Sequence, residues 1–420
     1  MSIFTRAVLL SAALGLTSAS AQTTVTLMTW EGASTNALIR KALDQFSKAN
    51  PDIKIEMVPS PNSGYDQKIQ SMILARKLPD LFWIGNDKIL EFGGKGLLYD
   101  WSKAALNPGD LKLSNFAPGA LEKYKLGGKL YGLPSLMNTY GYFYNADLFT
   151  ASGVPLPKPG WTYTQFYAAA KALSKNGKYA VVNSTPDPFN SPFLMSQYSL
   201  SAGGAAFQDR YLNPSKVTAS TQFIEGTTLL AAAIKSGYIA PPSYATDGQL
   251  ENFLAGNVPM LGGGQWLAAG MLQTKPKFKV GFVPLPQVKV RAQPFDAVGI
   301  AASASLKNPD AAWKVMTWLD SKGWESILPG APVAPSAYVP SATPYFNTLK
   351  AGGYGSVADS VKYVLGTTTT DGVRFVAPWS GKANDQVKAS WSDILLGKVA
   401  VQPGVTKLVE QLNTLISDNK

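Results

Sequence analysis

Hydrophobic and polar positions along the first part of the chain follow two alternating periods. Residues 25–30, 53–58 and 81–84 are short runs dominated by apolar side chains, the pattern of β-strands. Between them, residues 36–50 and 65–76 repeat apolar side chains every three or four positions, which predicts helices with one buried face. Strands that alternate with helices predict an α/β fold in which helices cover a parallel sheet.

The carboxyl ends of these predicted strands carry aromatic and polar residues. In an open parallel sheet, ligands collect at that edge, because the carboxyl ends of the strands meet there. Six residues lie at or just beyond the predicted strand ends: Trp30, Glu31, Asn62, Ser63, Asn86 and Asp87. They are the first candidates for a binding site.

A different order of elements follows in residues 130–174. A Gly/Pro turn leads into an aromatic strand, a short helix, a second Pro/Gly loop and an amphipathic helix. This order suits a chain that crosses from one α/β lobe into another near residues 132–137. The length of 420 residues exceeds what one hydrophobic core usually supports, which also predicts two lobes.

The N-terminal residues have the pattern of a secretion signal. Arg6 supplies a positive charge, residues 7–16 are apolar, and the small residues at 19–21 resemble a cleavage site before Gln22. A membrane anchor would need about 20 apolar residues, more than this segment provides. The chain has no cysteine, so a lipid-carrying cysteine after the cleavage site is impossible. We therefore predict a signal peptide over residues 1–21 and a soluble, periplasmic protein that is not a lipoprotein.

Composition and charge narrow the class of protein. A hydrophobic content of 45% predicts a globular fold. The net charge of +11 is scattered, and the densest basic group is interrupted by β-branched residues and prolines: Lys275, Lys277, Lys279, Lys289 and Arg291. We interpret it as a solvated face and expect no nucleic-acid partner.

The residue types present exclude most enzyme classes. Without histidine or cysteine, the chain can form no Ser-His-Asp or Cys-His arrangement and no histidine-rich zinc site. Neither a phosphate-binding loop nor a dinucleotide fingerprint occurs. We predict no cofactor and no metal. A glycoside hydrolase remains as an alternative, because it needs only two carboxylates, such as Glu31 and Asp87.

Several short motifs, in order, resemble one bacterial family. They are NPDI at residues 50–53, ARKLPD at 75–80, YNADLF at 144–149, GNVPM at 256–260 and AAW at 311–313. Their order over most of the chain is similar to that of the bacterial extracellular solute-binding protein family 1, the maltose-binding type. The register is not fixed in residues 187–193, where that family places a polar and an aromatic ligand contact.

The resemblance implies a fold and a function. The fold is the two-lobe periplasmic binding protein fold, with residues 22–135 and 299–342 in an N-terminal lobe and residues 136–298 and 343–420 in a C-terminal lobe. Such a protein captures a small carbohydrate by hinge closure, and a di- or oligosaccharide is the favoured ligand. It then delivers the sugar to the permease subunits of an ABC transporter. We expect a monomer.

A sugar site needs flat apolar surfaces for pyranose rings, together with donors and acceptors for hydroxyl groups. The resemblance makes Trp266 a stacking residue and Trp83 with Asp87 an aromatic and acidic pair, and Gly263 and Gly264 would let backbone approach the ligand. The complete set of candidates is Trp30, Glu31, Trp83, Asn86, Asp87, Tyr140, Gly263, Gly264, Trp266, Asp296, Arg374 and Trp379.

Structural roles compete with several of these assignments. Trp83 could belong to the core, and Glu31, Asp66 and Asp87 could cap helices. Tyr140 alternates with two further tyrosines, and core packing explains all three as well as ligand stacking does. Four more tryptophans are interpreted as core or helix residues: Trp161, Trp313, Trp318 and Trp324. A polyamine or a glycerol phosphate also remains open as the ligand; the latter would need Arg374 or a lysine in the cleft.

Overall fold

The structure is a computed structural model that describes residues 22–61, 63–109, 111–175, 177–244, 247–366 and 372–419. The predicted signal peptide and its cleavage site lie outside the described residues, as does Asn62. In the part of the chain that the structure describes, none of the helices has the length and hydrophobicity needed to cross a membrane.

Eight strands form one mixed sheet in the order β2-β1-β3-β10-β6-β8-β7, with β9 also paired to β6. Their bounds are β1 (Thr23–Thr29), β2 (Ile53–Pro59), β3 (Leu81–Gly85), β6 (Gly132–Asn145), β7 (Val181–Asn183), β8 (Met260–Gly264), β9 (Val280–Pro284) and β10 (Phe295–Ala302). A separate hairpin consists of β4 (Lys125–Leu126) and β5 (Lys129–Leu130). The three predicted strands are β1, β2 and β3, and they are parallel as expected.

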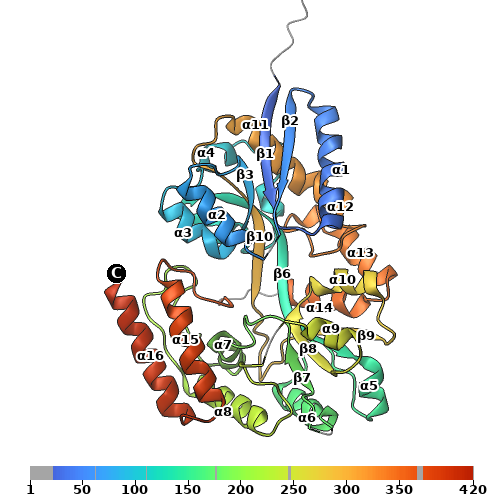
Figure 1. Cartoon of the computed structure of the whole chain (residues 1–420), viewed down its shortest axis with the longest axis vertical. Helices are drawn as coiled ribbons and strands as arrows, with labels where there is room; N and C mark the ends of the chain where they lie inside the picture. Colours follow the sequence, from blue (N-terminus) through green and yellow to red (C-terminus); the bar gives the residue numbers. More distant parts are fainter. Residues whose placement is uncertain are drawn as a thin grey trace, which may run out of the picture.

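Helices flank both ends of this sheet (Figure 1). Around β1, β2 and β3 lie α1 (Ala33–Ala49), α2 (Tyr65–Leu74), α3 (Ile89–Gly94), α4 (Ser102–Ala105), α11 (Pro309–Trp318) and α12 (Trp324–Ile327). Around the other end lie α5 (Ala146–Ala151), α6 (Tyr163–Leu173), α7 (Pro192–Ser201), α8 (Thr221–Lys235), α9 (Gln249–Leu254), α10 (Leu267–Thr274), α13 (Thr343–Ala351), α14 (Gly355–Leu365), α15 (Ser380–Leu395) and α16 (Val401–Asp418). Four short 3-10 helices are η1 (Asn86–Lys88), η2 (Leu113–Asn115), η3 (Leu121–Tyr124) and η5 (Val339–Ser341), and η4 (Leu319–Gly323) is a π-helix.

Strand β6 is the element that joins the two ends of the sheet. Its first part, up to Thr139, pairs with β10, and its second part, from Tyr140, lies between β8 and β9. Figure 1 shows β6 and β10 running from the upper half of the molecule towards the lower half. The pairing partners of β6 thus change between Thr139 and Tyr140, a few residues after the crossing expected at residues 132–137.

A buried glutamine completes the backbone pairing where β6 changes partners. The Gln265 side chain accepts a hydrogen bond from the backbone N–H of Thr139 at 2.6 Å and donates one to the carbonyl of Met137 at 3.2 Å. Gln265 is fully buried. Because unpaired buried backbone groups are costly, this side chain stabilises the strand at the junction.

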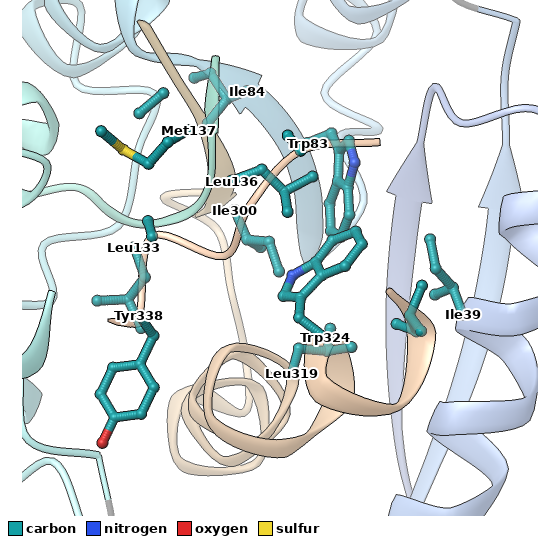
Figure 2. Packing of buried hydrophobic residues seen from close by; sticks show 14 of the residues in the cluster. Ile39, Trp83, Ile84, Leu133, Leu136, Met137, Ile300, Leu319, Trp324 and Tyr338 are labelled. Carbon is teal, nitrogen blue, oxygen red and sulfur yellow. The ribbon is translucent and has the colours of Figure 1, made fainter. Parts of the chain in front are cut away.

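The buried apolar side chains form two clusters. One contains Trp83, Trp101 and Trp324 and extends from the first strands and the helices α11 and α12 to α13 and α14; Figure 2 shows the part around Trp83 and Trp324. The other contains Tyr142, Phe207 and Trp391 and lies among helices α6, α7, α8 and α15. The tryptophans interpreted as core residues, at positions 161, 313 and 324, are buried, and Trp318 packs on Phe46.

Candidate functional site

A cavity of about 640 Å³ lies between the two halves and is called the central cavity below. Its walls come from the ends of β1 and β3, the middle of β6, the start of β10, the turn after β8 and the loop before α15. A volume of this size is typical of small-molecule sites. Eight of the predicted residues line it: Trp30, Glu31, Asn86, Asp87, Tyr140, Trp266, Asp296 and Arg374.

Trp83 is not on the cavity wall. It lies within β3, is only 1% exposed and packs against Trp324 with ring centroids 6.0 Å apart (Figure 2). Its indole Nε1 donates a hydrogen bond to Oε1 of Glu31 at 3.2 Å. The structure thus gives Trp83 the core role that the sequence left open, and through this bond Trp83 orients a residue that does face the cavity.

Gly263 and Gly264, the last two residues of β8, do not line the cavity either. A Cβ on Gly264 would collide with the indole ring of Trp266, and one on Gly263 would meet the Ser184 hydroxyl at 2.6 Å. Their missing side chains therefore make room for neighbouring protein groups. This corrects the expectation that they let backbone approach the ligand.

Trp379 also lies away from the cavity. It is 3% exposed and packs against Phe375, with ring centroids 5.3 Å apart, in the second apolar cluster. Its side chain thus belongs to the buried core of the second cluster and is not among the residues that line the cavity. The Pro-flanked sequence around it was consistent with either location.

Arg374 is the centre of a group of carboxylates, here called the aspartate cluster. Its Nη2 lies 3.4 Å from Asp296, its Nε 3.4 Å from Asp187 and its Nη1 3.6 Å from Asp87. Burial raises the pKa of Asp187, and Arg374 opposes that rise. Because Asp87 follows β3 and Asp187 follows β7, this one guanidinium connects the two ends of the sheet.

Tyr140 couples the aspartate cluster to an aromatic surface. Its hydroxyl donates a hydrogen bond to Asp296 at 2.7 Å, and its ring meets Trp266 edge to face with centroids 5.7 Å apart. Tyr142 and Tyr144 alternate with it along β6, and all three tyrosines are buried in the second cluster. Core packing thus accounts for all three, and of the three only Tyr140 also lines the cavity.

The structure also decides between capping and cavity roles for the acidic residues. Helix α1 begins after Gly32 and α2 after Gly64, and neither has a side-chain cap. Glu31 and Asp66 instead line the cavity. Asp87 lies in η1 and faces Arg374. Burial raises the pKa of Glu31, and the hydrogen bond from Trp83 lowers it in part.

Further residues on or beside the cavity were not singled out from the sequence. Asn138, Lys88 and Gln67 line the wall, and Asp187 belongs to the aspartate cluster. Asn138 is one of few polar residues in a mostly apolar strand, a signal that could have marked it. Asp187 lies in the segment whose register the sequence did not fix.

A second set of contacts joins the two halves beside the cavity. The Asn86 carboxamide donates a short hydrogen bond to the Tyr211 hydroxyl and accepts one from the backbone N–H of Ala297 at 2.6 Å. The Lys123 ammonium lies over the rings of Tyr211 and Phe295, 4.1 and 4.5 Å from their centroids. Among the described residues, no group of acidic, histidine or cysteine side chains has an arrangement that could hold a metal ion.

Comparison with known proteins identifies one family. The sequence model of the bacterial extracellular solute-binding protein family matches residues 30–325. A multiple sugar-binding protein from Streptococcus mutans is 24% identical over 313 residues, which cover 71% of this chain and 72% of that protein. An uncharacterized lipoprotein from Streptomyces antibioticus is 29% identical over 233 residues, 55% of this chain and 49% of that protein. The chain thus spans about half the length of this second relative.

A solved structure agrees with the fold described above. An ABC substrate-binding protein from Listeria monocytogenes, in complex with cycloalternan, has a TM-score of 0.76 and 21% sequence identity. The alignment covers 94% of this chain and 99% of that chain. At this identity the likeness concerns the fold, and it confirms the predicted α/β class with a large sheet flanked by helices.

Proposed function

Because the chain belongs to the bacterial extracellular solute-binding protein family, we propose that it captures a small carbohydrate in the central cavity and delivers it to an ABC transporter. The family and the structural neighbours are substrate-binding proteins, so the chain is not an enzyme. The hydrolase alternative built on Glu31 and Asp87 is therefore set aside.

The observation that carries the proposal is the combination of groups around the central cavity. Trp30, Tyr140 and Trp266 offer aromatic surface, while Asn138 and the carboxylates offer hydrogen-bonding partners. Aromatic rings suit the CH faces of pyranoses, and amides and carboxylates suit their hydroxyls. The S. mutans relative is named as a multiple sugar-binding protein, which supports the same ligand class.

Capture would proceed by rotation of two lobes, the first from residues 22–135 and 299–342 and the second from residues 136–298 and 343–420. Helix α14 supports this division, because its Ser360 hydroxyl donates a hydrogen bond to the Phe282 carbonyl in β9 at 2.8 Å. A ligand that contacts both lobes favours the closed form, since those contacts exist only there. A micromolar affinity corresponds to roughly 8 kcal/mol, which ring stacking and several buried hydrogen bonds can supply.

The setting proposed for this activity is the periplasm. The protein would act there as a monomer, load with sugar and dock on the permease subunits of the transporter, without nucleic acid as a partner. The family's extracellular character and the signal-like residues 1–21 support this location.

Replacing Trp266 with alanine should weaken carbohydrate binding by at least about 1 kcal/mol, roughly fivefold, because the sugar loses a stacking surface. Calorimetric titration with the tightest-binding member of a panel of di- and trisaccharides measures the change. Tyr244→Ala is the matched control, because Tyr244 is 38% exposed and is not among the residues that line the cavity. Equal affinities for Trp266→Ala and wild type, with both proteins folded, would remove Trp266 from the site.

A further inference from the structure

The central cavity is acidic in a chain that is basic as a whole. The chain has 38 lysines and arginines against 27 aspartates and glutamates. Around the cavity the balance reverses, and the charged residues there are Glu31, Asp66, Asp87, Lys88, Asp296 and Arg374. Asp187 adds a further carboxylate through its contact with Arg374.

The two cations do not balance this charge. Arg374 carries one positive charge and lies within 3.6 Å of three carboxylates. Lys88 is shared between Asp66 at 3.9 Å and Glu91 at 3.6 Å. An excess of negative charge therefore remains on the cavity wall when the carboxylates are ionised, and a partly buried excess of this kind attracts cations.

Glu31, just beyond the carboxyl end of β1, adds to this excess. Among the described residues, the hydrogen bond seen on its carboxylate is the one that Oε1 accepts from Trp83. No cation is paired with this side chain in the part of the chain that the structure describes. Ionising Glu31 in its partly buried position costs free energy, because the carboxylate loses hydration. A positively charged group on the ligand would offset this cost by pairing with the carboxylate.

We propose that the carbohydrate captured in the central cavity is an amino sugar, whose ammonium group lies among Glu31 and the aspartate cluster while a pyranose face contacts Trp266. The inference rests on the proposed function and narrows its ligand class. A neutral sugar would leave the excess charge uncompensated. A polyamine would supply charge but no hydroxyl groups for the carboxamides of Asn138 and Gln67, which also line the wall.

The test uses ligands that differ in one substituent. Glucosamine, galactosamine, mannosamine and the β-1,4-linked glucosamine disaccharide are titrated into the full chain by calorimetry, each beside its neutral hydroxyl and N-acetyl counterparts. The titrations are run at about pH 6, below the pKa of a sugar amine. We expect at least one amino sugar to bind tenfold or more tightly than both counterparts, with a preference that shrinks as salt screens the charges.

Two isosteric variants test which carboxylates produce the preference for amino sugars. Glu31→Gln keeps the acceptor for Trp83, and Asp296→Asn keeps the acceptor for Tyr140, so both should fold while losing threefold or more of the preference for the ammonium group. Glu56→Gln, at an exposed position paired with Lys54, is the control and should keep the full preference.

Different failures have different meanings. Neutral sugars that bind as tightly as their amino counterparts would overturn this inference and leave the proposed function standing. Binding of spermidine in the absence of any sugar binding would overturn both. A panel in which no amino sugar binds would also contradict the inference, as would an undiminished preference in Glu31→Gln and Asp296→Asn.

Discussion

Replacing Arg374 with methionine should lower the free energy of unfolding by about 3 kcal/mol at pH 7. The guanidinium faces a different carboxylate with each of its three nitrogens, so its removal leaves Asp87, Asp187 and Asp296 close together without a cation. Burial already raises the pKa of Asp187 and Arg374 opposes that rise, so removing the guanidinium raises this pKa further in the folded variant. The loss should therefore be largest at neutral pH and shrink towards pH 4, as the carboxyl group of Asp187 becomes protonated.

Urea denaturation at both pH values measures this effect. Arg40→Met, on the exposed face of α1, is the control and should change stability by less than about 0.5 kcal/mol. Arg374→Lys should recover part of the loss, because an ammonium group keeps the charge but cannot reach three carboxylates in fork geometry. If Arg374→Met were as stable as the wild type at pH 7, the ion pairs between Arg374 and the aspartate cluster would contribute nothing to the free energy of unfolding.

Replacing Asp320 with asparagine should stabilise the protein increasingly as pH rises. Asp320 is fully buried in η4, and neither carboxylate oxygen has a hydrogen-bond partner of good geometry among the described residues. Burial raises its pKa to about 8, against a smaller lowering by the nearby Ser135 hydroxyl. The folded protein thus keeps a proton that the unfolded chain releases near pH 4, and wild-type stability falls between about pH 4 and pH 8.

Asparagine has a similar shape and stays neutral, so the variant avoids this loss. The advantage of Asp320→Asn should grow by about 1.4 kcal/mol per pH unit within the window and level off above the folded pKa. Denaturation at pH 5 and pH 8 measures it, and Asp393→Asn, at an exposed position, is the control and should change stability by less than about 0.5 kcal/mol. A constant difference between Asp320→Asn and wild type would mean that Asp320 is already ionised in the folded protein at pH 5.

The first half of the fold could be predicted because its determinants are local. The residues that form β1, α1, β2, α2 and β3 show clear periodicity, and parallel strands bring their carboxyl ends to one edge. That rule was sufficient to place Trp30, Glu31, Asn86 and Asp87 on one cavity. The expectation of a change of lobe near residues 132–137 also came from local sequence, the Gly/Pro turn and the aromatic strand after it, and it stays a prediction.

Contacts between distant segments could not be predicted in the same way. A tryptophan in the middle of a strand and one just beyond a strand end have similar neighbours in sequence. The sequence therefore could not tell that Trp83 is buried in the core while Trp30 lines the cavity; the three-dimensional structure shows this difference. Likewise, the glycines of β8 are explained by Trp266 and Ser184, which fold back onto them. Asp187 joins Arg374 across nearly two hundred residues, and no local pattern marks that pair.

The central claim is carbohydrate capture, and a thermal-shift screen followed by product analysis tests it most directly. The protein is heated with mono-, di- and oligosaccharides, amino sugars, polyamines and glycerol phosphates, and every ligand that raises the melting temperature is recovered and identified. A ligand that binds only the folded state stabilises it by mass action. We predict that a carbohydrate raises the melting temperature and is recovered intact. Stabilisation by a polyamine or a glycerol phosphate alone, or a sugar recovered cleaved, would contradict the account.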